Sequence, residues 1–139
     1  MWGYDLRSDD TPIEANLGFT CRPNGEYKGH KAIERQRNEG IQKRLVFLTL
    51  DENIPIWGLE GVYRNGQPVG HLRRAEYGYD LGKQIGKAYI HRTDGKPIDQ
   101  SYLLDGHYQI DIMGQLHSAK CLLRSPFDSK NQRIFGNYD

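Results

Sequence analysis

The pattern of apolar and polar positions changes at residue 43, and from there on it predicts short β-strands. Residues 45–50 form a nearly continuous run of apolar and β-favouring side chains, which is typical of a strand covered on both faces. Residues 62–64 and 68–71 flank Asn65-Gly66, a pair that tolerates the positive φ angles of a two-residue turn. These two segments are therefore predicted to form a β-hairpin.

The same pattern predicts further strands later in the chain. They span residues 84–90, 107–113 and 115–123, and a tight turn at Gly114 joins the last two. Short strands separated by glycine-rich turns favour a mainly β fold, a small closed antiparallel barrel of six strands with a jelly-roll-like form. Pro126 cannot donate to a ladder of strand hydrogen bonds, so the tail beyond it is expected to leave the sheet.

The chain before residue 41 has weaker periodicity. Residues 13–20 alternate between apolar and small or polar side chains, which predicts a half-buried strand. Residues 29–40 carry the only helical pattern, with a narrow apolar face and a glycine at the end. Because the chain opens on Trp2 and Tyr4 with no capped element before them, we expect it to continue something longer.

Composition limits the classes of partner. A chain of 139 residues holds one core, and 19 Lys and Arg against 18 Asp and Glu leave a net charge of +1. The mean hydropathy is −0.78, and no apolar run approaches the roughly 18 residues that a membrane span needs. We therefore expect no nucleic-acid or membrane partner. Two cysteines in no paired spacing favour a reducing compartment.

The common signatures of catalysis are absent from the sequence. The five histidines have no chelating spacing, so no metal site is expected. Neither Cys21 nor Cys121 lies in the sequence context of a nucleophile, and both are interpreted as structural thiols. The segment 78–84 has three residues between its glycines where a phosphate-binding loop needs four, so no nucleotide site is predicted.

Nucleic-acid binding by the barrel is the alternative that residue types alone leave open. Tyr77 and Tyr79 offer stacking surfaces, and Arg73 and Arg74 offer phosphate contacts. The near-neutral net charge argues against this alternative. Because side chains alternate along a strand, Arg73 and Arg74 are predicted to face opposite ways at a solvated strand end.

Several separated motifs nevertheless resemble one family. The aromatic-Gly-x-acid-aliphatic run at 2–6 and the T-P-I-E-A-N-L-G-F run at 11–19 resemble a segment of the aminomethyltransferase family. Residues 27–33 resemble the entry to a helix of that family, and the K-R-L-V run at 43–46 resembles the first strand of its C-terminal barrel. Further matches to landmarks of that barrel lie at 69–70, 77–78 and 85–90.

The resemblance implies a domain organisation and an activity. Residues 1–40 would be the remnant of a preceding α+β, aminomethyltransferase-like folate-binding domain, and residues 41–139 the C-terminal β-barrel domain. The phrases W-G-Y-D-L-R-S-D-D-T-P, V-G-H-L-R-R-A and S-P-F-D are similar to the sarcosine and dimethylglycine dehydrogenase group, the sarcosine member above all. Such enzymes demethylate sarcosine to glycine with covalent FAD and pass the one-carbon unit to tetrahydrofolate.

The same resemblance implies partners and a location. They are the rest of the parent polypeptide, folate and, through the parent, electron-transfer flavoprotein, in the mitochondrial matrix if the source is eukaryotic and in the cytoplasm otherwise. The chain itself would close the folate channel as a wall and would not turn over alone. An alternative is a non-catalytic interaction module, as in the regulatory subunit of pyruvate dehydrogenase phosphatase.

Five positions are candidates for the folate side of this site. Arg44 matches a basic family position, and its guanidinium can pair with a carboxylate such as the glutamate tail of folate, although an exposed strand-end charge is the alternative. Trp2 and Tyr4 are aromatic walls or core residues of the preceding domain. Glu14 orients a ligand or forms a structural ion pair, and His30 stands where the family more often has Lys or Arg.

The sequence departs from the family pattern at two places, and it also predicts how residues 1–40 are anchored. Asn16 replaces the usual glycine, and Arg73-Arg74 replace a common Thr-Ser. If the chain is a piece of a longer protein, residues 1–40 should be poorly anchored and Leu17 and Phe19 exposed. An exposed strand at 13–20 would then pair with a second copy, which predicts a dimer.

Overall fold

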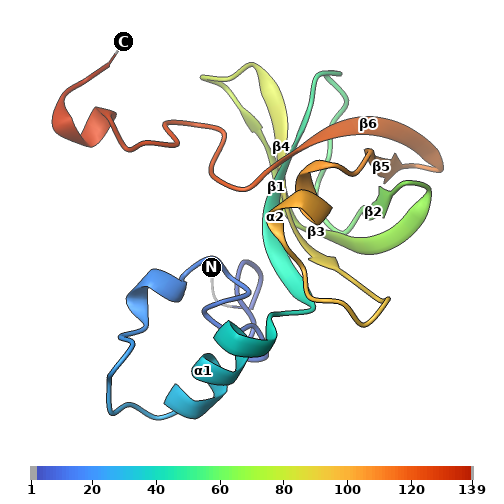
Figure 1. Ribbon diagram of the computed structural model, residues 1–139. Helices are drawn as coiled ribbons and strands as arrows, with labels where there is room; N and C mark the ends of the chain where they lie inside the picture. The colour runs from blue at the N-terminus through green and yellow to red at the C-terminus, as the bar shows by residue number, and fades with distance from the viewer. Residues whose placement is uncertain (1–2, 139) are drawn as a thin grey trace.

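The computed structural model describes residues 3–138, and a closed β-barrel dominates it (Figure 1). Its strands are β1 (Lys43–Leu50), β2 (Gly61–Arg64), β3 (Gln67–Gly78), β4 (Lys83–His91), β5 (Tyr108–Ile112) and β6 (Gln115–Leu122). They close in the order β1-β4-β3-β2-β5-β6 with every neighbouring pair antiparallel. The predicted six-stranded antiparallel barrel is therefore confirmed.

The barrel interior is filled by apolar side chains from alternate strand positions. In β1 the side chains of Val46, Leu48 and Leu50 are fully buried, as alternation along a strand that faces a core requires. Leu72 of β3 and Ile110 of β5 meet them inside the same cluster. One close approach demands glycine, because a Cβ at Gly70 of β3 would lie 2.4 Å from the carbonyl oxygen of Tyr89.

The predicted hairpin turns are confirmed. Asn65 and Gly66 have φ of 50° and 76° between β2 and β3, and Met113 and Gly114 have φ of 54° and 84° between β5 and β6. Positive φ at both central residues matches the right-handed twist of the flanking strands. Asp111 Oδ1 accepts a hydrogen bond from the Gly114 backbone N–H at 2.9 Å, which fixes the second turn.

Between residues 3 and 138, two α-helices and two short 3₁₀ helices accompany the barrel. The predicted helix is confirmed as α1 (His30–Glu39), which lies apart from the barrel in Figure 1. A second helix, α2 (Gln100–Leu104), was not expected, because five residues are too few to show a helical period. It is capped by Asp99, whose Oδ1 accepts from the Tyr102 backbone N–H at 2.7 Å, and its Leu103 enters the core.

The strand predicted over residues 13–20 is wrong. These residues form turns followed by the 3₁₀ helix η1 (Gly18–Thr20). Thr11 and Glu14 cap each other, since Glu14 Oε2 accepts from the Thr11 backbone N–H at 2.8 Å and Thr11 Oγ1 accepts from the Glu14 N–H at 3.3 Å. Asn16 then has a φ of 61°, which ends any extended run. The strand on which the predicted dimer depended is not formed.

Residues before β1 are also better anchored than expected. The Asp10 side chain is fully buried and accepts from Lys43 Nζ at 2.8 Å and from Arg73 Nη2 at 3.3 Å. Asp5 pairs with Lys87 of β4 at 3.3 Å. The expectation of poor anchoring is therefore corrected for residues 5–16, while Leu17 and Phe19 are exposed as predicted.

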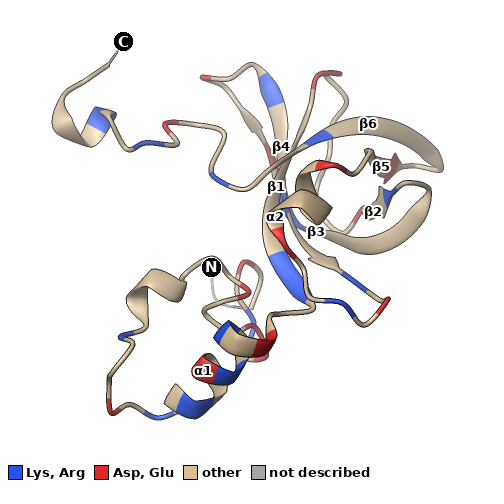
Figure 2. Cartoon of the chain, in the orientation of Figure 1, with Lys and Arg blue, Asp and Glu red and all other residues tan. Residues whose placement is uncertain are grey.

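Arg73 and Arg74 differ in exposure, but the alternation on which their prediction rested is interrupted, because a β-bulge shifts the register between Leu72 and Arg74. Both side chains pair with residues before β1, Arg73 with Asp10 and Arg74 with Asp5. The Arg73 side chain is 7% exposed and the Arg74 side chain 45%. Arg73 is thus a buried partner of Asp10 and not a solvated strand-end charge. Figure 2 shows that basic and acidic positions are interspersed over the barrel and α1, so no broad face of one sign forms in this view.

The chain leaves the barrel after β6, as the proline predicted. The C-terminal tail extends from the barrel and carries the 3₁₀ helix η2 (Arg133–Phe135), with Ile134, Phe135 and Tyr138 exposed (Figure 1). No helix of the described residues is long and apolar enough to cross a bilayer. Residues 3–138 also contain no cluster of three or more His, Cys, Asp or Glu side chains placed to hold a metal ion.

Candidate functional site

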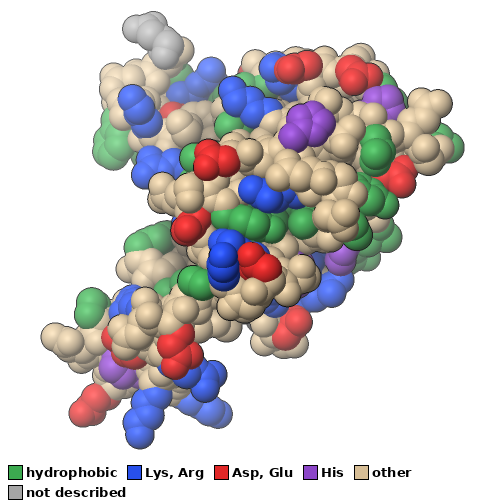
Figure 3. Space-filling view, turned by 45° about the vertical axis from the view of Figure 1, so that its right-hand side comes forward, with side chains coloured by type: hydrophobic (Ala, Val, Ile, Leu, Met, Phe, Trp, Pro, Cys, Tyr) green, Lys and Arg blue, Asp and Glu red, His purple; other side chains and the backbone are tan. Residues whose placement is uncertain are grey.

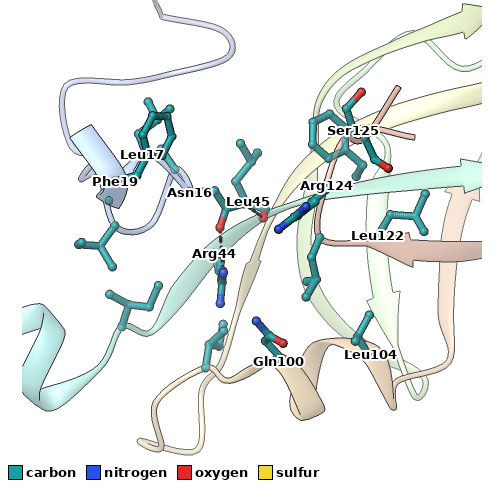
Figure 4. Close-up of a pocket in the computed structure, with 18 of the residues that line it drawn as sticks. Asn16, Leu17, Phe19, Arg44, Leu45, Gln100, Leu104, Leu122, Arg124 and Ser125 are labelled. Atoms are coloured by element: carbon teal, nitrogen blue, oxygen red, sulfur yellow. Dashed lines mark hydrogen bonds between the residues drawn. The ribbon is translucent and has the colours of Figure 1, made fainter. Parts of the chain in front are cut away.

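A groove of ≈ 1320 Å³ opens where the N-terminal segment, β1, α2 and the chain leaving β6 meet (Figure 4). The N-terminal segment is defined here as residues 3–42. In the space-filling view the surface is hollowed between this segment and the C-terminal tail (Figure 3). The groove is therefore built from parts of the chain that are far apart in sequence.

One wall of the groove is apolar. Leu45 and Phe47 contribute to it because they occupy the β1 positions that alternate with the buried Val46 and Leu48. Leu122, at the end of β6, lies beside them through the antiparallel register that pairs it with Phe47. Leu17, Phe19 and Leu104 extend the apolar surface from the N-terminal segment and α2. This surface suits a flat apolar or aromatic ligand ring.

Three guanidinium groups and one carboxylate lie in the same groove. Arg37 is used structurally, because its Nη1 pairs with Glu34 at 2.6 Å and its Nη2 donates to the Cys21 carbonyl at 2.7 Å. The carboxylate of Asp128 is also used, since its two oxygens accept from the backbone N–H groups of Gln132 and Arg133. These two charges stabilise the chain locally.

The other two guanidinium groups have free donors. Arg44 donates its Nε to Asn16 Oδ1 at 2.8 Å, and its two Nη groups form no hydrogen bond or ion pair with any residue between 3 and 138. Arg124 has no polar side-chain contact within the same described range, and Figure 4 shows it between Leu45 and Leu122. Two under-used cations beside an apolar wall are chemically suited to a ligand that combines a ring with a carboxylate.

Arg44 lies near the start of β1, at the end of the barrel. It lies on the same side of β1 as Val46 and Leu48, but one step before the closed interior begins. Its side chain therefore reaches the rim of the barrel, where Figure 4 shows it directed toward Gln100 at the start of α2. A guanidinium at a rim keeps its charge solvated and is not buried in the core.

The remaining predicted site residues lie elsewhere. Tyr4 is 65% exposed and does not line the groove, and Trp2 lies outside the described residues. Glu14 is buried in its turn with Thr11, and Lys43 Nζ lies 3.8 Å from its carboxylate. His30 begins α1, with Nε2 2.9 Å from the Pro23 carbonyl oxygen and its ring edge-on to Tyr27. Among the candidates that the structure describes, Arg44 lines the groove, and Tyr4, Glu14 and His30 do not.

Arg124 and Asn16 are groove residues that were not candidates from the sequence. The antiparallel register that pairs Phe47 with Leu122 carries Arg124 toward Leu45, the neighbour of Arg44. A correct pairing of the first and last predicted strands would have found Arg124. Asn16 was recognised as a departure from the family pattern, but only the folded chain shows that its amide reaches Arg44.

A second polar cluster fixes the N-terminal segment beside the groove. Burial alone would raise the pKa of Asp10, but hydrogen bonds from Lys43 and the Arg7 backbone, with the charge of Arg73, hold it below its ordinary value. The Arg73 guanidinium lies over the Tyr89 ring at 4.7 Å, and burial raises the pKa of Tyr89 to about 12. We call Asp10, Lys43, Arg73 and Tyr89 the Asp10 cluster.

Two histidines near this cluster favour the neutral form. Burial, followed by the charges of Lys43 and Arg73, lowers the pKa of His91 at the end of β4. Burial, followed by the charge of Arg73, lowers the pKa of His71 in β3. Neither histidine lines the groove.

Comparison with known proteins identifies the fold and its relatives. The family model described as the glycine cleavage T-protein C-terminal barrel domain matches residues 43–128. Human mitochondrial sarcosine dehydrogenase is 42% identical over 139 residues, which cover 99% of this chain and 15% of that protein. The aminomethyltransferase of Bacillus subtilis is 31% identical over 130 residues, covering 91% of this chain and 33% of that protein.

Two further comparisons bear on the interpretation. The mitochondrial pyruvate dehydrogenase phosphatase regulatory subunit of mouse is 31% identical over 136 residues, covering 88% of this chain and 15% of that protein. The aminomethyltransferase T of the Bartonella henselae glycine cleavage system superposes with a TM-score of 0.75 at 18% identity, over 93% of this chain and 35% of that one. The chain thus spans about one seventh of the sarcosine dehydrogenase length that it matches.

Proposed function

Because this chain belongs to the glycine cleavage T-protein C-terminal barrel family, we propose that it forms the folate-side barrel of a flavin-dependent sarcosine dehydrogenase. The whole enzyme would demethylate sarcosine to glycine, with FAD as electron acceptor and tetrahydrofolate as acceptor of the one-carbon unit. The 42% identity to human and mouse sarcosine dehydrogenase over nearly all of this chain supports that assignment. The boundary between a folate-domain remnant at 1–40 and the barrel domain at 41–139 belongs to the same proposal.

The groove is the observation that carries the folate role. It combines an apolar wall with two guanidinium groups, Arg44 and Arg124, whose donors are under-used by the described residues. Tetrahydrofolate combines a flat ring system with a glutamate tail, so the groove has the chemistry to contact both parts. We propose that Arg44 binds a carboxylate of that tail and that the apolar wall excludes water from the one-carbon unit.

The flavin would be held outside this chain. A dinucleotide fold needs parallel strands with a helix crossover, whereas all neighbouring strands between residues 43 and 122 are antiparallel. The described residues do not fit FAD, so we derive no step through it. In this proposal the partners are the rest of the parent polypeptide, folate and electron-transfer flavoprotein, and the mitochondrial names of the relatives support a matrix location in a eukaryotic source.

Titration with tetrahydrofolate tests the proposal. The natural polypeptide that contains these 139 residues is titrated by calorimetry as the unaltered protein, as Arg44→Ala and as Arg35→Ala. Arg44→Ala should weaken binding roughly 10- to 100-fold, the range expected for a lost hydrogen bond to a charged group. Arg35, an exposed residue of α1 outside the groove, is the matched control and should leave binding unchanged.

The carboxylate assignment has its own control ligand. 6-Methyltetrahydropterin carries the reduced ring but no carboxylate, so Arg44→Ala should not alter its dissociation constant. An unchanged tetrahydrofolate constant in Arg44→Ala removes Arg44 from the site, and no binding by the unaltered protein contradicts the folate role. In that case, a non-catalytic module like the pyruvate dehydrogenase phosphatase regulatory subunit becomes the better assignment. That assignment now ranks second, because this chain is 31% identical to the regulatory subunit and 42% identical to sarcosine dehydrogenase.

A further inference from the structure

We propose that Asn16 is a positioning residue that aims the two Nη groups of Arg44 into the groove. This inference rests on the function proposed above and names the device that would set affinity for the carboxylate of the ligand. It follows from the hydrogen bonds that Asn16 makes and from the conformation of its backbone. No contact of Asn16 itself with the ligand is required.

The amide of Asn16 is held in one orientation. Its Nδ2 donates to the Leu45 carbonyl oxygen at 2.8 Å, and its Oδ1 accepts from Arg44 Nε at 2.8 Å. A carbonyl oxygen only accepts and a guanidinium only donates, so the opposite orientation of the amide would leave both contacts unmade. The two partners therefore fix which end of the amide faces Arg44.

The backbone beside Asn16 is fixed as well. The Leu45 N–H donates to the Glu14 carbonyl oxygen at 2.8 Å, so residues 14–16 and 44–45 are joined by three hydrogen bonds. Glu14 is in turn held by its mutual capping with Thr11. Asn16 is thus attached to a well-supported turn and can hold the longer side chain of Arg44 in place.

Because Asn16 occupies only the Nε donor of Arg44, the edge formed by the two Nη groups remains available to a ligand. Arg carries five N–H donors in one plane, and the neutral Asn16 oxygen occupies the single donor on the Nε side. The Nη groups remain for a bidentate contact with a carboxylate, and the side chain is already ordered before the ligand arrives. Figure 4 shows Asn16 and Arg44 joined at this edge of the groove.

Asparagine suits the position for a backbone reason too. The φ of residue 16 is 61°, in the left-handed region where Gly and Asn are the residues accommodated most readily. Glycine would adopt this backbone but would bring no amide to Arg44. An asparagine here therefore satisfies the turn and adds the support, whereas a glycine satisfies only the turn.

Replacing Asn16 by glycine tests this role while preserving the backbone. The dissociation constants of tetrahydrofolate and of the carboxylate-free 6-methyltetrahydropterin are measured by calorimetry for the natural polypeptide containing this chain. The variants are Asn16→Gly, Arg44→Ala, the double variant, and the control Asn24→Gly at an exposed position outside the groove. We expect Asn16→Gly to weaken tetrahydrofolate binding roughly three- to tenfold, less than Arg44→Ala because the guanidinium itself remains, and to leave 6-methyltetrahydropterin binding unchanged.

The double variant separates positioning from a general loosening of the fold. If Asn16 acts through Arg44, Asn16→Gly has no further effect in the Arg44→Ala background. Equal weakening of both ligands, or a full Asn16→Gly effect in that background, overturns the inference. ¹⁵N relaxation of Arg44 Nε gives a readout without ligand, and it should show an ordered side chain that becomes mobile in Asn16→Gly.

The outcomes also distinguish the inference from the function on which it rests. If Arg44→Ala binds tetrahydrofolate more weakly but Asn16→Gly binds it as tightly as the unaltered protein, the positioning role is overturned and the folate role still stands. An unaltered protein that binds neither ligand contradicts the proposed function and the inference together. An Arg44 Nε that is equally mobile with and without Asn16 overturns the inference whatever the ligand data show.

Discussion

The barrel and the N-terminal segment are held by different forces. The barrel buries a continuous apolar cluster from all six strands, whereas the segment is attached to it through the Asp10 cluster, the Asp5–Lys87 pair and the hydrogen bonds of residues 14–16. Apolar burial is non-directional and is not subject to charge screening, while ion pairs fix direction and respond to pH and ionic strength. The difference teaches that the barrel supplies stability and the polar attachment supplies the geometry of the groove.

The largest effect should come from the barrel core. Leu48→Ala removes a fully buried side chain from the centre of β1 and should lower the free energy of unfolding by about 2–5 kcal/mol. Urea unfolding followed by circular dichroism measures the loss. Leu104→Ala, at a half-exposed position of α2, is the control and should stay within about 0.5 kcal/mol. Similar losses in both variants would contradict the assignment of stability to the barrel interior.

A smaller and local effect should follow from breaking the Asp10 cluster. Asp10→Asn leaves Lys43 and Arg73 without their shared carboxylate and should lower the free energy of local opening of residues 3–16 by roughly 2–3 kcal/mol. Hydrogen exchange should show faster amides in that segment and unchanged amides in β1–β6. Asp9→Asn, an exposed neighbour, is the matched control. Global destabilisation without local opening would break the distinction between the two regions.

The two regions should also lose stability in different pH ranges. Burial lowers the pKa of His71 and His91, so the unfolded chain takes up their protons first, near the ordinary value of 6.5. The contribution of the two neutral histidines to the free energy of unfolding is complete above that pH and declines as the pH falls below it. The pKa of Asp10 is also lowered in the folded state, so its contribution persists until the pH falls below the ordinary value of 3.8.

Unfolding by urea at pH 7.5, 5.5 and 3.5 measures these ranges. His91→Gln should flatten the decline between pH 7.5 and 5.5, and Asp10→Asn should flatten the later decline toward pH 3.5 and below. A decline of equal slope in His91→Gln and the unaltered protein would remove His91 as its source.

The smallest effect concerns the two thiols, one in each region. Burial raises the pKa of the Cys121 thiol in β6 to about 11, whereas Cys21 in the N-terminal segment is only half-buried. A disulfide reagent at pH 7.5 should therefore modify Cys21 rapidly and Cys121 only when the barrel opens. Cys21→Ser should abolish the fast phase and Cys121→Ala the slow one. Rapid modification of both thiols would show that the barrel opens more readily than its core suggests.

Most of the barrel could be predicted from the sequence because its signals are local. A nearly continuous apolar run marks β1, and positive-φ pairs mark the turns at Asn65-Gly66 and before β6. For the one strand predicted wrongly, the structure shows why the local pattern was misleading. Residues 13–20 alternate like a strand, but the mutual capping of Thr11 and Glu14 turns the chain before it can extend.

The candidate site was less accessible to sequence reasoning. Arg44 was found through a family resemblance, and its position at the barrel rim follows from alternation in β1. Arg124 enters only when β6 pairs with β1, and the Asn16 contact spans 28 positions in the chain. Hydrogen bonds of that range depend on how separate segments pack, which no periodic pattern encodes.

The sequence by itself determined the β-strands, their turns, α1 and the family, because each of these is written in neighbouring residues or in short motifs. Only the tertiary structure decided that Arg73 is buried against Asp10, that Glu14 caps a turn away from the groove, and that Asn16 holds Arg44 at its edge. Burial and charge pairing are properties of what surrounds a side chain. Those surroundings exist only after the barrel has closed and the N-terminal segment has bound to its rim.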